Sequence, residues 1–283
     1  MFLPPESKHG VQGVLSNGSR KMMACEALPG SPRVLAIGAH PDDIEFMMAG
    51  TLLCLRLKGW EVHYLNIADG SCGSVKLDAD ETAKLRRKEA QEAAEIMEAQ
   101  WHPPLTRDLE IFYGDELIRR LGAVMRTVAP DVLLIHHPVD YMEDHMNACR
   151  LSVTAAFSRG MPNYQTQPPV DPIEKPIALY HALPHGLMTP FGEEVSGSFY
   201  VNVGPVLERK KAALHAHRSQ QEWLDRSQGM SSYLEDMVET TRQMGRQSEC
   251  FEWAEGWVPH APLGFCSPGD RPLQEALTDS INL

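Results

Sequence analysis

Several features that mark common protein classes are missing from this sequence of 283 residues. Its six cysteines form no Cys-x-x-Cys pair, so a cysteine-based zinc site has little support, and their scattering favours reduced thiols in a cytoplasmic protein. No apolar run approaches the length that spans a bilayer. Basic residues number 26 against 38 acidic ones, and the resulting charge of −12 argues against a nucleic-acid partner.

Two further absences concern the N-terminal end and nucleotide binding. Residues 1–30 contain prolines, glycines and lysines but no continuous apolar segment, so they do not resemble a secretion signal. We expect an irregular N-terminal extension there. No Gly-x-Gly-x-x-Gly motif follows the first apolar run, which argues against a dinucleotide-binding domain.

The sequence does contain an alternation of short apolar runs with stretches of helical periodicity. The runs predict strands at residues 33–40, 61–68, 109–113, 131–137, 177–183 and 198–203. The periodic stretches predict helices at residues 44–58, 81–99, 115–128, 144–158, 205–224 and 231–244. This alternation is typical of the α/β class, with a Rossmann-like, doubly wound, mostly parallel sheet and helices on both faces. A proline-rich connection at 161–176 and a C-terminal tail at 266–283 complete the expected organisation.

The first predicted strand ends abruptly in a polar block that contains His40, Pro41, Asp42 and Asp43. In open α/β sheets the edge where a strand turns into a helix is where ligands bind. His40 and Asp43 are three residues apart, and Pro41 stiffens the turn, so both side chains can point at one metal ion. Helix N-capping is the alternative role for the two aspartates. Capping needs only one residue, however, and does not explain the preceding histidine.

A second polar block, residues 136–145, follows the strand predicted at 131–137. In a doubly wound sheet these two strands are neighbours, so His40 and Asp43 would face His145. Two histidines and an aspartate with an open fourth position are typical of catalytic zinc, although Fe²⁺ or Mn²⁺ also accept these ligands. Asp42 would then lie beside the metal as a general base.

Both blocks resemble the PIG-L/LmbE family of zinc-dependent deacetylases, which remove acetyl groups from N-acetylglucosamine units and related amides. The resemblance is carried by Ala39-His-Pro-Asp-Asp43, Asp144-His145, Arg86-Arg-Lys-Glu89, Lys211–Gln220 and Ala254-Glu255-Gly256. These segments extend in order over residues 33–265, which predicts one deacetylase-like domain at 31–265. The resemblance also implies a homo-oligomer.

Residue by residue, the family pattern makes His40, Asp43 and His145 the zinc ligands and Asp42 the general base. Members of the family carry a further histidine three residues before the last ligand, thought to protonate the leaving amine or stabilise the oxyanion. Met142 occupies that position here. Another residue must therefore protonate the leaving amine, or Asp42 must itself return the proton that it took from water.

Four other residues are candidates for substrate binding: Arg86, His137, Tyr141 and His185. His137, Tyr141 or His185 could replace the missing histidine, and spacing does not choose among them. Arg86 matches an arginine of the family and could hold hydroxyls or an anion, whereas an ion pair with Glu89 on the same helix is the ordinary alternative.

The predicted activity is hydrolysis of the acetyl amide of an N-acetyl amino sugar or its conjugate, with zinc-bound water as nucleophile. The expected partner is thus a small-molecule amino sugar. Two other hypotheses stay open: hydrolysis of a different ester or amide bond on the same metal, and a metal- or sugar-binding homologue without turnover. Asp42 speaks against the second, since a protein that only binds needs no base beside the metal.

Overall fold

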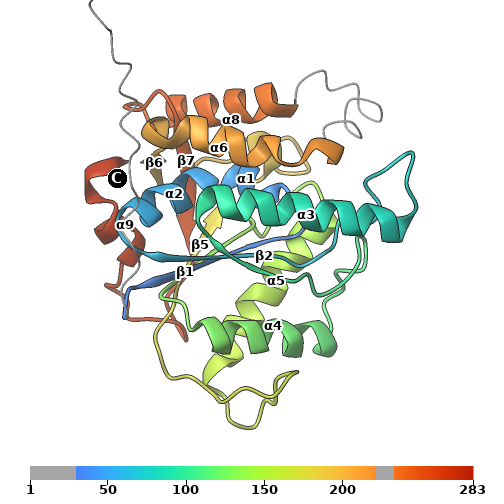
Figure 1. Cartoon of the computed structure of the whole chain (residues 1–283). Helices are drawn as coiled ribbons and strands as arrows, with labels where there is room; N and C mark the ends of the chain where they lie inside the picture. Colours follow the sequence, from blue (N-terminus) through green and yellow to red (C-terminus); the bar gives the residue numbers. More distant parts are fainter. Residues whose placement is uncertain (1–29, 221–232, 283) are drawn as a thin grey trace, which may run out of the picture.

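The computed structural model describes residues 30–220 and 233–282, and this part of the chain contains one mixed sheet (Figure 1). From one edge to the other, its strands are β3 (Gln100–His102), β2 (Glu61–Asn66), β1 (Arg33–Gly38), β4 (Val132–Ile135), β5 (Ala178–Ala182), β7 (Ala254–Pro259), β6 (Phe199–Asn202) and β8 (Ile281–Asn282). Neighbours from β3 to β5 pair in parallel, and the pairs that involve β7 or β8 are antiparallel. The expected fold class and the adjacency of β1 and β4 are confirmed.

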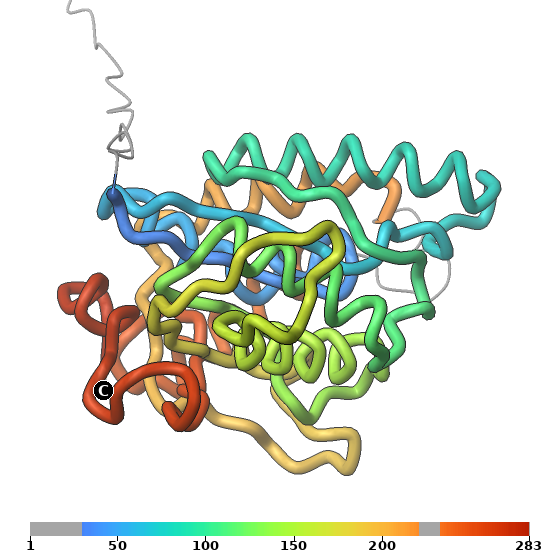
Figure 2. Tube along the Cα trace, turned by 90° about the horizontal axis from the view of Figure 1, so that it is seen from below, coloured from blue at the N-terminus to red at the C-terminus, as the bar shows by residue number. Residues whose placement is uncertain are grey.

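Helices cover both faces of the sheet. They are α1 (Asp43–Met47), α2 (Ala49–Leu57), α3 (Ala79–Met97), α4 (Asp115–Val128), α5 (Glu143–Phe157), α6 (Leu207–His215), α8 (Tyr233–Gln247) and the short α9 (Pro272–Ala276). In Figure 1, α1, α2, α3, α6 and α8 lie above the sheet, and α4 and α5 lie below it. Figure 2 shows the molecule from below, and the irregular connection 161–176 runs across the side that faces the viewer. Arg126 of α4 donates a hydrogen bond to the carbonyl of Val170 in this connection at 2.8 Å.

The central strand β1 shows why this sheet needs two helical layers. Val34 and Ala36 contribute to one hydrophobic core, and Leu35 and Ile37 to the other; all four are fully buried. A strand that is covered on both faces is apolar at successive positions rather than at alternate ones. This explains the continuous apolar run that precedes the first polar block.

The prediction of a strand at 109–113 was wrong. Leu109 has a φ of 61°, in the left-handed region, which interrupts an extended backbone. The third parallel strand is instead β3, a short segment directly after α3 whose residues pair with β2. The segment around Leu109 forms a loop at the rim of the cavity described below.

The helix expected at 44–58 is divided at Met48, where φ is −131° and α1 gives way to α2. The buried carboxylate of Glu255, on β7, accepts hydrogen bonds from the amides of Gly50 at 2.8 Å and Thr51 at 2.7 Å. These amides belong to the first turn of α2, which has no intrahelical partners for them. A residue about two hundred positions away thus caps the second helix.

The C-terminal third contributes more to the sheet than the sequence indicated. Strand β7 was missed, and residues 266–283, which we set apart as a tail, supply α9 and β8. The helix expected at 205–224 appears as α6, which ends at His215; residues 221–224 and most of the N-terminal extension lie outside the described residues. No helix among the residues described has the length and apolarity to cross a bilayer.

Candidate active site

A cavity of about 450 Å³ is lined by residues of both polar blocks. The first block follows β1 and the second follows β4, and these strands are parallel neighbours with Val34 opposite Val132 and Ile37 opposite Ile135. Their carboxyl ends therefore meet at one edge of the sheet. The prediction that the two polar blocks lie close together is therefore confirmed, and the parallel register of β1 and β4 is the reason.

The turn after β1 is held closed by Asp43. Its Oδ2 accepts hydrogen bonds from the amides of Ala39 at 3.0 Å and His40 at 2.7 Å. Nε2 of His136 lies 3.2 Å from the same oxygen, and it accepts a hydrogen bond from the amide of Ala39 at 2.9 Å. Asp42 is at the N-cap position of α1 but forms no side-chain capping bond. Capping therefore does not explain Asp42, and Asp43 serves the turn rather than the helix terminus.

The three predicted ligands do come together. His145 Nε2 lies 3.3 Å from Asp43 Oδ1, and His40 Nδ1 lies 3.6 Å from Asp43 Oδ2. One ligand atom from each of His40, Asp43 and His145 lies within 4.8 Å of the others, which fits a shared ion. Two imidazole nitrogens and one carboxylate oxygen form the donor set of catalytic zinc sites, and Fe²⁺ or Mn²⁺ bind such sets as well.

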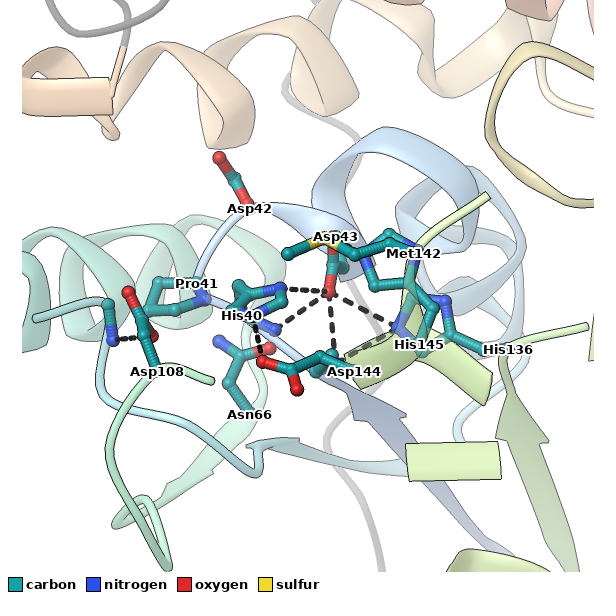
Figure 3. A network of polar contacts seen from close by, with 12 residues as sticks. His40, Pro41, Asp42, Asp43, Asn66, Asp108, His136, Met142, Asp144 and His145 are labelled. Atoms are coloured by element: carbon teal, nitrogen blue, oxygen red, sulfur yellow. Dashed lines mark hydrogen bonds and ion pairs between the residues drawn. The ribbon is translucent and has the colours of Figure 1, made fainter. Parts of the chain in front are cut away.

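The far nitrogen of each histidine is held by a further carboxylate. His145 Nδ1 lies 3.0 Å from Asp140 Oδ1, and His40 Nε2 lies 3.0 Å from Asp144 Oδ2 (Figure 3). Asp144 also accepts from the amide of Leu109 at 2.9 Å. Carboxylates in this position fix the tautomer and orientation of ligand histidines. Asp144 therefore has His40 as its imidazole partner.

The protonation of the cluster follows from these contacts. Burial lowers the pKa of His40 and His145, but the hydrogen bonds and charges of Asp144, Asp43 and Asp140 outweigh it and raise the values to about 9 and about 10. Burial would raise the pKa of Asp43, yet the charges and hydrogen bonds of His145 and His136 hold it well below its usual range. These contacts thus favour the protonated form of His40 and His145 and the ionised form of Asp43.

Asp42 lies apart from this network. In Figure 3 its carboxylate points away from the contacts drawn around Asp43. It lines the cavity and is 4% exposed, and its Oδ2 is 3.4 Å from Nη2 of Arg86. Burial raises the pKa of Asp42 to about 6, although the charge of Arg86 opposes the increase. A carboxyl group with a pKa close to neutral is suited to accept and return a proton.

Three of the four candidate substrate-binding residues line the cavity. Arg86, Tyr141 and His185 line the cavity, and the ring of His185 packs against those of Phe46 at 4.5 Å and Tyr141 at 5.7 Å. His137 is not among the cavity-lining residues described; its Nδ1 lies 2.8 Å from the carbonyl oxygen and 3.2 Å from the amide nitrogen of Val139 in its own turn.

Sequence reasoning missed several residues that shape the site. Asp140 and His136, both buried in the second block, were not singled out, although carboxylates beside ligand histidines are a recognisable signal. Gln220 and Tyr233 line the cavity from segments far along the chain. Nothing in the local pattern around these two residues could have placed them there.

Comparison with known proteins agrees with this geometry. Residues 35–157, which contain both polar blocks, match the family model PIG-L, described as GlcNAc-PI de-N-acetylase. Over these residues the chain is similar to the PIG-L family. The diacetylchitobiose deacetylase of Thermococcus kodakarensis is 28% identical over 195 residues, which cover 66% of this chain and 70% of that protein.

Solved structures share the fold of this chain. The N,N'-diacetylchitobiose deacetylase of Pyrococcus horikoshii superposes with a TM-score of 0.68 at 23% identity, over 84% of this chain and 86% of that one. The 4-carboxy-2-hydroxymuconate hydratase GalB of Pseudomonas putida gives 0.67 at 22% identity, over 81% and 95%. Because a hydratase and a deacetylase share this architecture, the reaction must be argued from the site.

Proposed function

We propose that this protein is a metal-dependent hydrolase that removes the acetyl group from the amide nitrogen of an N-acetyl amino sugar or its conjugate. The observation that carries the proposal is the convergence of His40, Asp43 and His145 beside Asp42 in one cavity. The match of residues 35–157 to the PIG-L family model and the similarity to the deacetylase relative support the choice of reaction.

Zinc is the proposed ion, held by His40, Asp43 and His145, with Fe²⁺ or Mn²⁺ as alternatives. When bound, zinc would act as a Lewis acid and bring the pKa of its water to about 7. Asp140 and Asp144 keep the two imidazoles oriented toward Asp43. The donor atoms that face Asp43 are therefore arranged before any ion arrives.

Asp42 is the proposed general base. It accepts a proton from the attacking water and, in the absence of a histidine at position 142, returns it to the departing amine. The raised pKa of Asp42 supports both steps, because a group that titrates near pH 6 both gains and releases a proton readily at neutral pH. Tyr141 and His185 are the proposed substrate contacts, since both line the cavity. His137 lies outside this lining and contributes only if the turn moves.

Met142 supports a second candidate function. Without a histidine at position 142, one general acid that could protonate the leaving group is missing. This favours substrates whose leaving group departs easily, such as esters. We therefore keep hydrolysis of another ester or amide bond on the same metal as the alternative. The cytoplasmic location and a homo-oligomeric state stay predictions.

The test is a substrate panel with zinc-loaded protein in which acetate and free amine are measured separately. N,N'-diacetylchitobiose, N-acetylglucosamine and an aryl acetate ester cover both candidate functions. We expect release of acetate and amine in equal amounts from a sugar, and a loss of about 10²-fold or more in Asp42→Asn. Turnover of the ester alone would favour the alternative. No turnover at all, with Asp42→Asn unchanged in every assay, would favour a binding protein.

A further inference from the structure

Arg86, on α3, is buried beneath the turn that carries the first polar block; its exposed fraction is 2%. Its Nη2 donates to the carbonyl of Pro41 and lies 3.4 Å from Asp42 Oδ2. Its Nη1 donates to Oε1 of Gln220, another residue that lines the cavity. One planar guanidinium thus contacts the backbone and the side chain of the same turn as well as a residue from a distant segment.

The backbone held in this way is strained. Asp42 has φ 111° and ψ −24°, a conformation that residues with a side chain rarely adopt. Such a residue costs on the order of 1–3 kcal/mol and persists only where its surroundings fix it. The hydrogen bond from Arg86 to Pro41 acts on the peptide directly before Asp42. Arg86 is therefore placed to hold the strained residue in its conformation.

The glycine-rich loop after β2 closes over the same guanidinium. A Cβ at Gly70 would lie 2.8 Å from Cδ of Arg86, and a Cβ at Gly73 would lie 2.6 Å from its Nη1. Gly70 also has a φ of +77°, which favours glycine. The loop therefore covers Arg86 and restricts it to one position. A side chain at either position would collide with Arg86, so the close approach of the guanidinium explains both glycines.

The same helix also binds the segment that contains Gln220. Glu89, one turn after Arg86, accepts from the amide of Ser219 at 2.9 Å and from its hydroxyl at 2.5 Å. Ser219 directly precedes Gln220, which Arg86 contacts. The Arg-x-x-Glu pair therefore does not form the internal ion pair that its spacing allowed. Each member instead binds a different segment to α3.

We propose that Arg86 is a positioning residue that fixes the strained turn at Asp42, so that the base is presented at one place beside the metal ligands. Its part in catalysis rests on the proposed function, whereas its hold on the turn does not. A direct contact between Arg86 and the substrate is the competing role, and the two differ in what they do to kcat and to KM.

Three variants of the full-length chain test this. Arg86→Lys keeps the charge but loses the planar fork, and Arg86→Gln loses both. Gly73→Ala leaves Arg86 in the sequence but occupies the space of its Nη1. The matched control is Arg126→Lys: Arg126 is also buried, 4% exposed, and donates to the carbonyls of Ser158, Met161, Tyr164 and Val170, which are not among the residues that line the cavity.

Hydrogen exchange measured by mass spectrometry reports on the turn without any need for activity. For peptides that span residues 38–46, with and without added Zn²⁺, we expect exchange about tenfold faster or more in Arg86→Gln and smaller increases in Arg86→Lys and Gly73→Ala. Arg126→Lys should accelerate exchange only around residues 158–170. Unchanged exchange at 38–46 in the Arg86 and Gly73 variants would overturn the proposal. If Arg86→Gln does not fold, the other two variants carry the test.

Steady-state kinetics then separate positioning from substrate binding. Displacement of the base predicts a fall in kcat of about 10²-fold in Arg86→Gln, with KM nearly unchanged and partial recovery in Arg86→Lys. A raised KM with kcat retained would show that Arg86 binds substrate instead. A wild-type protein without hydrolase activity would defeat the proposed function, and the exchange result would still decide whether Arg86 holds the turn.

Discussion

The carboxylate of Asp140 lies 3.0 Å from Nδ1 of His145 and leaves Nε2 of the same ring facing Asp43 at 3.3 Å. Both residues are buried, and they come from one turn and the helix that follows it. Asp140 thus determines which nitrogen of His145 is available to a metal ion. The orientation of His145 is thus fixed by a residue of its own polar block.

Asp140→Asn should therefore weaken metal binding without removing a ligand. Loss of the carboxylate makes the imidazole a poorer donor and frees its tautomer, so we expect Zn²⁺ affinity to fall about 10- to 100-fold. Competition with a chromophoric chelator measures the dissociation constant. Asp279→Asn, at a carboxylate that is 85% exposed, is the control and should bind Zn²⁺ like the wild type. Equal affinities for all three proteins would contradict the role given to Asp140.

Metal binding should also stabilise the fold. Because the ligand cluster exists only in the folded state, Zn²⁺ at a hundred times its dissociation constant should raise the free energy of unfolding by about 2.7 kcal/mol. Chemical denaturation with and without Zn²⁺ or a chelator measures this difference. His145→Ala should lose the effect, whereas His215→Ala, at an exposed position on α6, should keep it. A similar Zn²⁺ effect in both variants would place the metal elsewhere.

The neighbouring lysines 210 and 211 provide a second matched comparison. Lys210 and Glu255 form a fully buried ion pair at 2.6 Å, whereas Lys211 pairs with the exposed Glu208 at 2.9 Å. Lys210→Met leaves a buried carboxylate without its cation, so we expect a loss of about 3–5 kcal/mol in unfolding free energy. Lys211→Met should cost about 1 kcal/mol or less. Urea unfolding measures both, and equal losses would show that burial of the pair has no energetic consequence.

Acid should destabilise the protein in part through His181. This residue is buried, and its Nδ1 donates to the carbonyl of His136 at 2.9 Å. Burial lowers its pKa from 6.5 to about 4, although the hydrogen bond to His136 opposes the decrease. Between these values the unfolded chain binds a proton that the folded protein does not bind. Stability therefore falls as the pH decreases from about 6.5 toward 4.

His181→Gln should reduce that pH dependence. One such group contributes at most about 1.4 kcal/mol per pH unit, so the slope of unfolding free energy against pH between 6.5 and 4 should decrease by up to this amount. Urea unfolding at a series of pH values gives the slope. His215→Gln serves as the exposed control and should leave it unchanged. A slope that is the same in all three proteins would exclude His181 as a source of acid sensitivity.

Local patterns in the sequence determined the framework of this protein. The apolar runs of β1 and β4, the periodicity of α3 and α4, and the two polar blocks that follow the strands were all readable, because each depends on residues close together in the chain. Parallel topology then brings the carboxyl ends of neighbouring strands together. That is why His40, Asp43 and His145 could be assigned to one site before the structure was known.

Tertiary structure decided what depends on partners distant in sequence. The cap that Glu255 provides for α2, the hold of Arg86 on the turn at Asp42 and the pairing of Asp144 with His40 join positions that no local pattern relates. The sequence around Leu109 predicts a strand, but the positive φ of this residue in the folded chain makes the segment a loop. Hydrophobic periodicity records which face of an element is buried, but the partner of a buried charge is fixed only when the whole chain has folded around it.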